Sequence, residues 1–199
     1  MTSILTLNDI VDLREYERER ESFRRRVIAL KQVRRVNLGP IISLTFENRE
    51  TVRFQIQEMA RAEKMTSDAQ IQEELDVYNP LIPGPGQLSA TLFLELTTKD
   101  QLMEWLPKLV GIEQSLEAVI DSPEGDVAVP CEVEQSHLEQ LTRADVTASV
   151  HYIRFNLPED AAAAMRRAKR VEIRSIHHRY PYAVELSPET IASLVADWE

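Results

Sequence analysis

Residues 88–96 have the sequence LSATLFLEL, in which leucine or alanine occupies every second position. Side chains of a strand alternate between its two faces, so this period of two predicts a strand with one buried face. Further along, a helix is expected at 100–110, shortened or kinked by Pro107, then strands at 116–120 and 127–133, a short helix, and a strand at 148–156. The spacing of Val146, Val150 and Ile153 would also fit a helix in place of this last strand. The order strand, helix, strand, strand, helix, strand is that of a ferredoxin-like split unit.

The N-terminal part has a helical period instead. Apolar side chains recur every three or four positions, which predicts a long helix that begins after an N-cap at Asn8 and ends near Arg35. The pattern then changes to a period of two, which predicts a hairpin of strands at 42–46 and 52–56. A short helical stretch at 58–64 follows, and Ser67 with Gln70 forms a capping box for a helix that ends near Tyr78.

The C-terminal part continues the mixture. Pro158 marks a helix start, strands are expected at 171–176 and 182–186, and Ser187 caps a final helix. Pro130 cannot donate to a ladder, so the strand at 127–133 is expected at a sheet edge. The sequence therefore predicts an α+β fold, with helices packed on an antiparallel or mixed sheet. One domain over 1–199 is expected, which could divide into a helix-hairpin-helix part, 1–86, and a sheet-helix part, 87–199.

Composition narrows the function. The 199 residues are 43% apolar, with no run long enough for a membrane span and no secretory signal pattern, so a cytoplasmic protein without a membrane partner is expected. Residues 66–145 carry 3 basic and 16 acidic side chains, which makes nucleic acid a poor partner for that part. A basic cluster at 24–35 either completes a helix C-terminus or binds an anion. A protein partner is favoured, and a homodimer is compatible with the sequence.

Cofactor chemistry finds little support. Cys131 is the single cysteine, so the usual iron–sulfur and structural zinc sites are not expected. Glu134 and His137 form one Glu-x-x-His motif, whereas a di-iron bundle needs two. His177 and His178 are adjacent, so on a strand they would point to opposite faces. We therefore expect no metal, no cofactor and no catalytic residue.

The residues most suited to binding a ligand or a partner lie around a proline- and glycine-rich loop at 79–86, NPLIPGPG. Such a loop is stiff and costs little entropy on binding, although turn chemistry alone would also explain it. Arg20 interrupts the apolar face of the first helix, so it serves either an internal ion pair or a partner's anion. The candidate residues are Arg20, Glu58, Arg61, Tyr78, Asn79, Gly84, Gly86 and His151.

Four stretches also carry a resemblance to a known family: 8–40, 45–64, 74–96 (ELDVYNPLIPGPGQLSATLFLEL) and 150–155 (VHYIRF). Together they resemble the uncharacterised bacterial domain-of-unknown-function family numbered thirty-five hundred and one. That resemblance implies gene neighbours such as a rubrerythrin-like protein and an iron–sulfur oxidoreductase, and hence a redox or oxidative-stress setting. The first hypothesis is accordingly a non-catalytic accessory protein that binds such a redox partner. The alternative is a small enzyme or ligand-binding protein with its site near the loop at 79–86.

Overall fold

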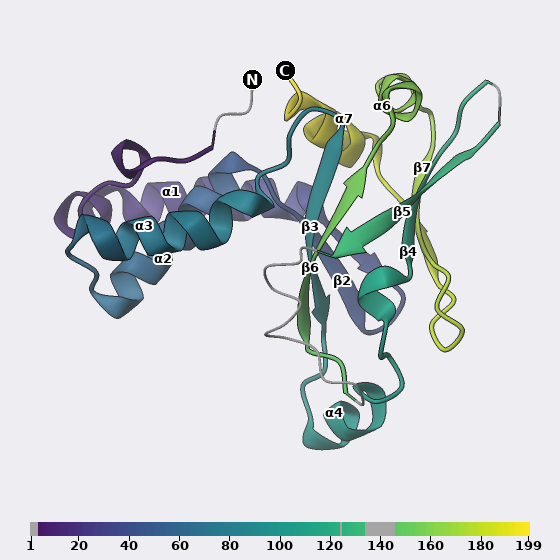
Figure 1. Cartoon of the computed structure of the whole chain (residues 1–199), viewed down its shortest axis with the longest axis horizontal. Coiled ribbons are helices and arrows are strands. Elements are labelled where there is room, and N and C mark those ends of the chain that lie inside the picture. Colours follow the sequence, from purple (N-terminus) through teal and green to yellow (C-terminus); the bar gives the residue numbers. More distant parts are fainter. Residues whose placement is uncertain (1–3, 124, 134–145) are drawn as a thin grey trace.

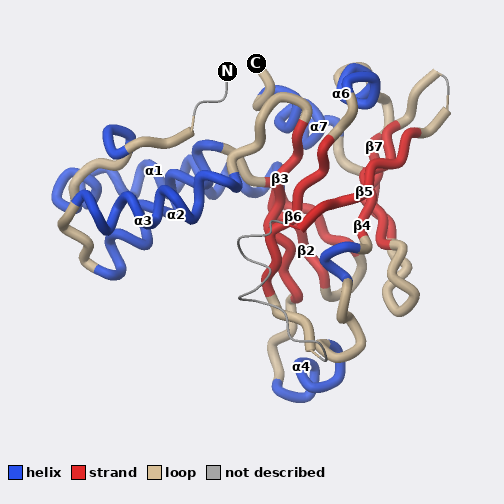
Figure 2. Tube along the Cα trace, viewed as in Figure 1, coloured by secondary structure: helices blue, strands red, loops and turns tan. Residues whose placement is uncertain are grey.

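The computed structural model describes residues 4–123, 125–133 and 146–199 and contains an eight-stranded antiparallel sheet (Figures 1 and 2). The strand order is β1-β2-β3-β6-β5-β4-β7-β8. The strands are β1 Arg35–Leu38, β2 Ile42–Phe46, β3 Gln87–Leu94, β4 Leu116–Ile120, β5 Val127–Val133, β6 Val150–Asn156, β7 Val171–Ser175 and β8 Ala183–Glu185. The predicted α+β class with an antiparallel sheet is confirmed.

The described helices lie on several sides of this sheet. They are α1 Leu13–Arg34, α2 Arg49–Glu63, α3 Asp68–Tyr78, α4 Lys99–Trp105, α6 Glu159–Met165 and α7 Pro188–Ala196, with 3-10 turns η1 Leu7–Asp9, η2 Asn79–Leu81 and η3 Ile112–Gln114. Figure 1 shows α1, α2 and α3 packed together and projecting from one side of the sheet. Among the described residues, no helix has the length and apolar content needed to cross a bilayer.

Strand β3 shows how the sheet separates two environments. Leu88, Ala90 and Leu92 point to one face, where they join the main hydrophobic core with β6, β4 and β7. Side chains alternate along a strand, so Thr91 and Phe93 point to the other face, toward α1–α3. The helices pack on each other through a second core that includes Val52, Ile56, Leu75 and Leu81.

The sheet curves until its edge strands β1 and β8 approach each other. The buried hydroxyl of Tyr180 bridges this seam: it accepts hydrogen bonds from the backbone N–H groups of Ile41 (3.0 Å) and Ile42 (3.2 Å) and donates one to the carbonyl of Leu38 (2.7 Å). Gly39, at φ +68°, turns the chain between β1 and β2 directly beneath this residue.

The first helix begins later than predicted. Its N-cap is Asp12, whose carboxylate accepts hydrogen bonds from the N–H groups of Arg14 and Glu15, both at 2.9 Å. Asn8 lies instead in η1, a separate turn that Thr6 and Asp9 close through their side chains. Two capping residues compete in this segment, and the helix starts at the second.

The strand predicted at 52–56 is wrong, because these residues form part of α2. Val52 and Ile56 are four positions apart, so the same residues satisfy a helical period as well as alternation. Asn48 decides between the two, because its side chain accepts hydrogen bonds from the N–H groups of Glu50 and Thr51 at 3.1 Å and caps the helix. Strand β2 pairs instead with β1, across the turn at Gly39.

The middle of the chain keeps its predicted strands but not the predicted arrangement. Strand β6 lies between β3 and β5. In a ferredoxin-like unit β3 would instead be the central neighbour, between β6 and β5. The prediction that Pro130 lies on an edge strand is wrong, because β5 has neighbours on both sides. Strand β5 pairs with β4 up to Pro130 and with β6 from Cys131 onward, so Pro130 lies at the change from one pairing to the other. Helix α4 ends at Trp105, before Pro107. The Glu134–His137 motif and the helix expected beside it lie outside the described residues.

Candidate functional site

A cavity of about 250 Å³ lies where the sheet-facing ends of α1–α3 meet β2, β3 and β6. The residues that line it from the helices are Lys31, Val52, Gln55, Tyr78 and Leu81. Those that line it from the sheet are Glu47, Thr91, Phe93, Val150 and Tyr152. Charged, hydroxyl and aromatic groups therefore line one partly open cavity beside the proline- and glycine-rich loop.

Glu47 is the charged residue most deeply set in this cavity, with 7% of its surface exposed. One carboxylate oxygen accepts a hydrogen bond from the Thr91 hydroxyl at 2.7 Å. Within the described residues that is the only hydrogen bond to this carboxylate. The second oxygen keeps contact with solvent through the cavity, where it offers a strong acceptor to a ligand.

Lys31 brings the opposite charge to the same cavity. It is half-buried near the end of α1, and no acidic group in the described ranges forms an ion pair with it. Glu47 and Lys31 thus line one space without touching each other.

The backbone of Glu47 is fixed by Arg34, the last residue of α1, which is 1% exposed. The Arg34 guanidinium donates to the carbonyls of Phe46 (2.9 Å), Glu47 (3.1 Å) and Ser193 (3.0 Å). It also pairs with Asp197 at 2.5 Å. Because its donors are engaged in this way, Arg34 positions Glu47 without neutralising its side chain.

Aromatic side chains form part of the cavity wall. Burial raises the pKa of the Tyr152 phenol, and the nearby Tyr78 and Glu47 raise it further. The Tyr152 hydroxyl therefore stays protonated at neutral pH. Tyr152 lies on the sheet face that points to the helices, opposite to its neighbour His151.

The predicted candidate residues separate into groups. Tyr78 lines the cavity, whereas the Asn79 amide binds the backbone of Leu5, accepting from its N–H at 2.8 Å and donating to its carbonyl at 2.9 Å. The Gly84 N–H donates to the Gln87 side chain at 2.9 Å. Gly86, at φ +72°, accepts a hydrogen bond from the Leu157 N–H at 2.9 Å. The loop thus sets the start of β3, which carries Thr91 and Phe93.

The charged candidates form pairs between α1 and α2. Arg20 makes two hydrogen bonds to Glu58, at 2.7 and 2.8 Å, and the Tyr16 hydroxyl donates a third at 2.6 Å. These bonds, the Arg20 ones foremost, lower the pKa of Glu58 although burial opposes them. Arg61 pairs with Glu17 at 2.5 Å. None of the four charged side chains lines the cavity described above.

His151 lies on the opposite side of the sheet and is 2% exposed. Its Nε2 lies 2.8 Å from the Thr147 hydroxyl and 2.9 Å from the Ala148 carbonyl. Burial lowers the pKa of His151, and the nearby Glu113 carboxylate partly offsets this. Burial also raises the pKa of the Cys131 thiol to about 11, and the thiol lies 3.2 Å from the Glu113 carbonyl. Neither group belongs to the cavity.

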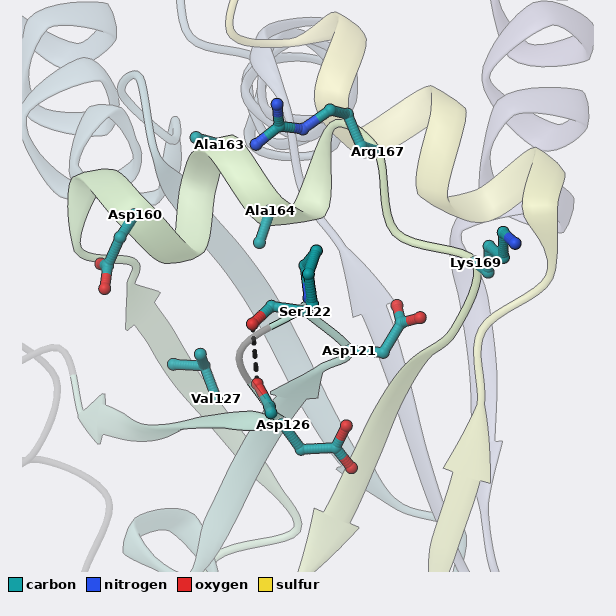
Figure 3. A pocket seen from close by; sticks show the side chains of 11 residues that line it. Asp121, Ser122, Asp126, Val127, Asp160, Ala163, Ala164, Arg167 and Lys169 are labelled. Atoms are coloured by element: carbon teal, nitrogen blue, oxygen red, sulfur yellow. Dashed lines mark hydrogen bonds between the residues drawn. The ribbon is translucent and has the colours of Figure 1, made fainter.

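A larger cavity, of about 1010 Å³, lies between the β4–β5 connection and α6 (Figure 3). Figure 3 shows Asp160, Arg167 and Lys169 spread around it rather than converging on one point. Asp121 and Asp126 are both engaged by Arg170, through its backbone N–H (2.9 Å) and its guanidinium (2.6 Å) respectively. Across the ranges that the structure describes, no group of three histidine, cysteine or acidic side chains is arranged to hold a metal ion. The smaller cavity is therefore the better candidate site.

Most of that site was missed from the sequence. Ser43, Thr45 and Glu47 share one face of β2 and its continuation, and Ser89, Thr91 and Phe93 share the matching face of β3. In the sequence alone, such a polar face predicts a side of the sheet that is exposed to solvent, because nothing indicates that helices cover it. The available signal was Glu47 itself, an acidic residue that follows a strand and precedes the capping residue Asn48.

Comparison with known proteins identifies relatives without a stated activity. A family model described as "Protein of unknown function (DUF3501)" matches residues 4–198. A crystal structure of a protein from Burkholderia pseudomallei, described as a novel protein of unknown function, is similar with 34% sequence identity and a TM-score of 0.89. The match covers 99% of this chain and 100% of that one. No curated protein matches the sequence.

Proposed function

The chain belongs to the DUF3501 family of proteins of unknown function, and we propose that it binds a small organic molecule in the cavity between α1–α3 and strands β2, β3 and β6. The observation that carries this proposal is Glu47, a buried carboxylate with one oxygen free of protein hydrogen bonds in the described structure. A donor group of a ligand would replace solvent at that oxygen and complete the hydrogen bonding of the carboxylate.

The size and setting of the cavity support a small ligand. Pockets for drug-sized ligands usually measure roughly 300–1,000 Å³, so a cavity of about 250 Å³ suits a smaller molecule. Tyr78 and Leu81 line it where the chain enters the loop at 79–86. Rigid walls of this kind reduce the entropy lost on binding.

The test is to purify the full chain from its native host, denature it, and identify the small molecules released by mass spectrometry. Val150→Trp places a large side chain in the cavity, and Val77→Trp is the control, because Val77 is 44% exposed and does not line it. A compound released by the wild type and by Val77→Trp, but absent from Val150→Trp, supports the proposal. The same released compounds from all three proteins would contradict it.

A second candidate function is that of a non-catalytic accessory protein for a redox partner. The observation that favours it is a pair of exposed apolar side chains on the β7–β8 connection, Ile176 (60%) and Tyr182 (42%). Apolar side chains exposed on one connection are available for a protein contact. If the partner is a rubrerythrin-like protein or an iron–sulfur oxidoreductase, co-purification with it should be lost in Ile176→Asp. It should persist in Met103→Asp, which changes an apolar residue 69% exposed on α4.

A further inference from the structure

We infer that the ligand of this cavity is a small zwitterion, a single free amino acid with a large apolar side chain, whose ammonium group pairs with Glu47 and whose carboxylate pairs with Lys31. This inference rests on the proposed function and names the class of molecule that the cavity would take. It follows from three features of the lining: one anion, one cation that forms no ion pair with it, and several apolar or aromatic side chains.

The anionic end is Glu47. Thr91 occupies one of its oxygens, and the nearest buried guanidinium, Arg34, is engaged by backbone carbonyls and by Asp197. Arg35, which lies over the Phe93 ring, is paired with Glu95. The remaining Glu47 oxygen therefore suits a donor from the ligand, and an ammonium group supplies a charge-assisted hydrogen bond there.

The cationic end is Lys31. Its ammonium group has no ion-pair partner in the part of the chain that the structure describes, although an acidic residue lines the same cavity. Lys31 and Glu47 form no ion pair with each other in the described ranges, so each is available to an opposite charge of a ligand. An α-amino acid carries an ammonium group and a carboxylate on one carbon. It can therefore pair with both Glu47 and Lys31 while adding no net charge to the cavity.

Apart from the Gln55 amide and the Thr91 hydroxyl, the rest of the lining is apolar or aromatic. Val52, Leu81 and Val150 present aliphatic surface, and Phe93 and Tyr152 present rings against which a flat apolar side chain can pack. A cavity of about 250 Å³ is below the usual range for drug-sized ligands, which favours a single amino acid over a peptide.

The test is isothermal titration of the full chain with L-phenylalanine and two analogues, each lacking one charge. Phenethylamine retains the ammonium group, and 3-phenylpropionate retains the carboxylate; L-leucine and L-methionine test the side chain. We expect L-phenylalanine to bind at least about tenfold more tightly than either analogue, since each lost charge pair costs more than 1.4 kcal/mol. L-Leucine and L-methionine should bind with the same dependence on both charged groups.

Two substitutions test which protein residue pairs with which charged group of the amino acid. Glu47→Gln should weaken amino-acid binding at least about tenfold but leave the binding of 3-phenylpropionate unchanged. Lys31→Met should weaken amino-acid binding by a similar factor but leave the binding of phenethylamine unchanged. Retained binding of the matching analogue also shows that each variant is folded. Glu73→Gln and Lys99→Met change exposed residues outside the cavity and should bind as the wild type does.

The outcomes separate the two proposals. Binding of phenethylamine or 3-phenylpropionate as tight as that of L-phenylalanine overturns the zwitterion and leaves the cavity as a binding site. If no amino acid binds while the native protein releases another compound that Val150→Trp lacks, the ligand class is wrong and the proposed function stands. If the released compounds do not depend on Val150, both fail.

Discussion

Arg34 and Asp197, at the C-terminal ends of α1 and α7, form an ion pair of 2.5 Å with side chains only 1% and 12% exposed. The two residues are 163 positions apart in the sequence, so their pair joins two distant helices. The same guanidinium donates hydrogen bonds to the backbone carbonyls of Phe46 and Glu47. Arg34 thus connects the helices, the sheet and the candidate cavity.

Replacing Arg34 by Met should destabilise the protein by about 3–5 kcal/mol, because it leaves Asp197 and several carbonyls without their cationic partner. Urea unfolding measures this loss. Arg25→Met, which breaks an exposed pair with Glu21, should change the free energy of unfolding by no more than about 0.5 kcal/mol. Equal effects of the two substitutions would show that burial does not decide the value of these pairs.

Glu58 should make stability depend on pH in the acid range. The Arg20 hydrogen bonds hold the pKa of Glu58 below its ordinary value, so its stabilising contribution is complete above about pH 4.5 and is lost as the pH falls through the folded-state pKa. The difference in unfolding free energy between wild type and Glu58→Gln should therefore shrink on acidification. In an Arg20→Met background this pH dependence should largely disappear. A difference that stays constant from pH 7 to pH 3 would contradict the assignment.

Cys131 should be unreactive in the folded protein. Burial raises the pKa of its thiol to about 11, so little thiolate exists at pH 8, and its side chain is buried in the main core. Iodoacetamide should label the thiol rapidly in urea and much more slowly without it. Similar rates in the two conditions would mean that the thiol is accessible in the native state.

Gly39 and Gly111 offer a matched pair of substitutions. Both have positive φ, at +68° and +88°, but a Cβ at Gly39 would lie 2.6 Å from the Tyr182 ring and 2.7 Å from the Tyr180 hydroxyl, whereas one at Gly111 meets nothing within 4 Å. Gly111→Ala should cost about 1–2 kcal/mol from the backbone alone. Gly39→Ala should cost about 1–3 kcal/mol more, from the clash. Equal losses of melting temperature would show that the seam at Tyr180 is not tightly packed.

Local signals in the sequence predicted much of the fold. Alternation located β3 and β5, strands were also expected where β4 and β6 lie, and Ser67 and Ser187 cap helices as expected. The failures occurred where one pattern fitted two structures. Val52 and Ile56 satisfy both periods, and a cap at Asn48, together with packing on α3, selects the helix.

The site could not be predicted in the same way, because it depends on which elements meet. Tyr78 was identified from its position beside the loop, and it does line the cavity. Thr91 and Tyr152 lie on β3 and β6, and Glu47 directly follows β2. The pairing of these strands is set by long-range register, which a periodic pattern does not encode. Arg20 illustrates the opposite case: one of the two interpretations of a charge on an apolar face was an internal ion pair, and its pairing with Glu58 agrees with that interpretation.

The most direct measurement is a crystal structure of the full chain purified from its native host without removal of bound compounds. The account predicts electron density for a small molecule between Glu47 and Lys31, with a donor atom about 3 Å from the free Glu47 oxygen. A cavity that holds only water, or a Glu47 carboxylate paired with the protein's own cations, would contradict it.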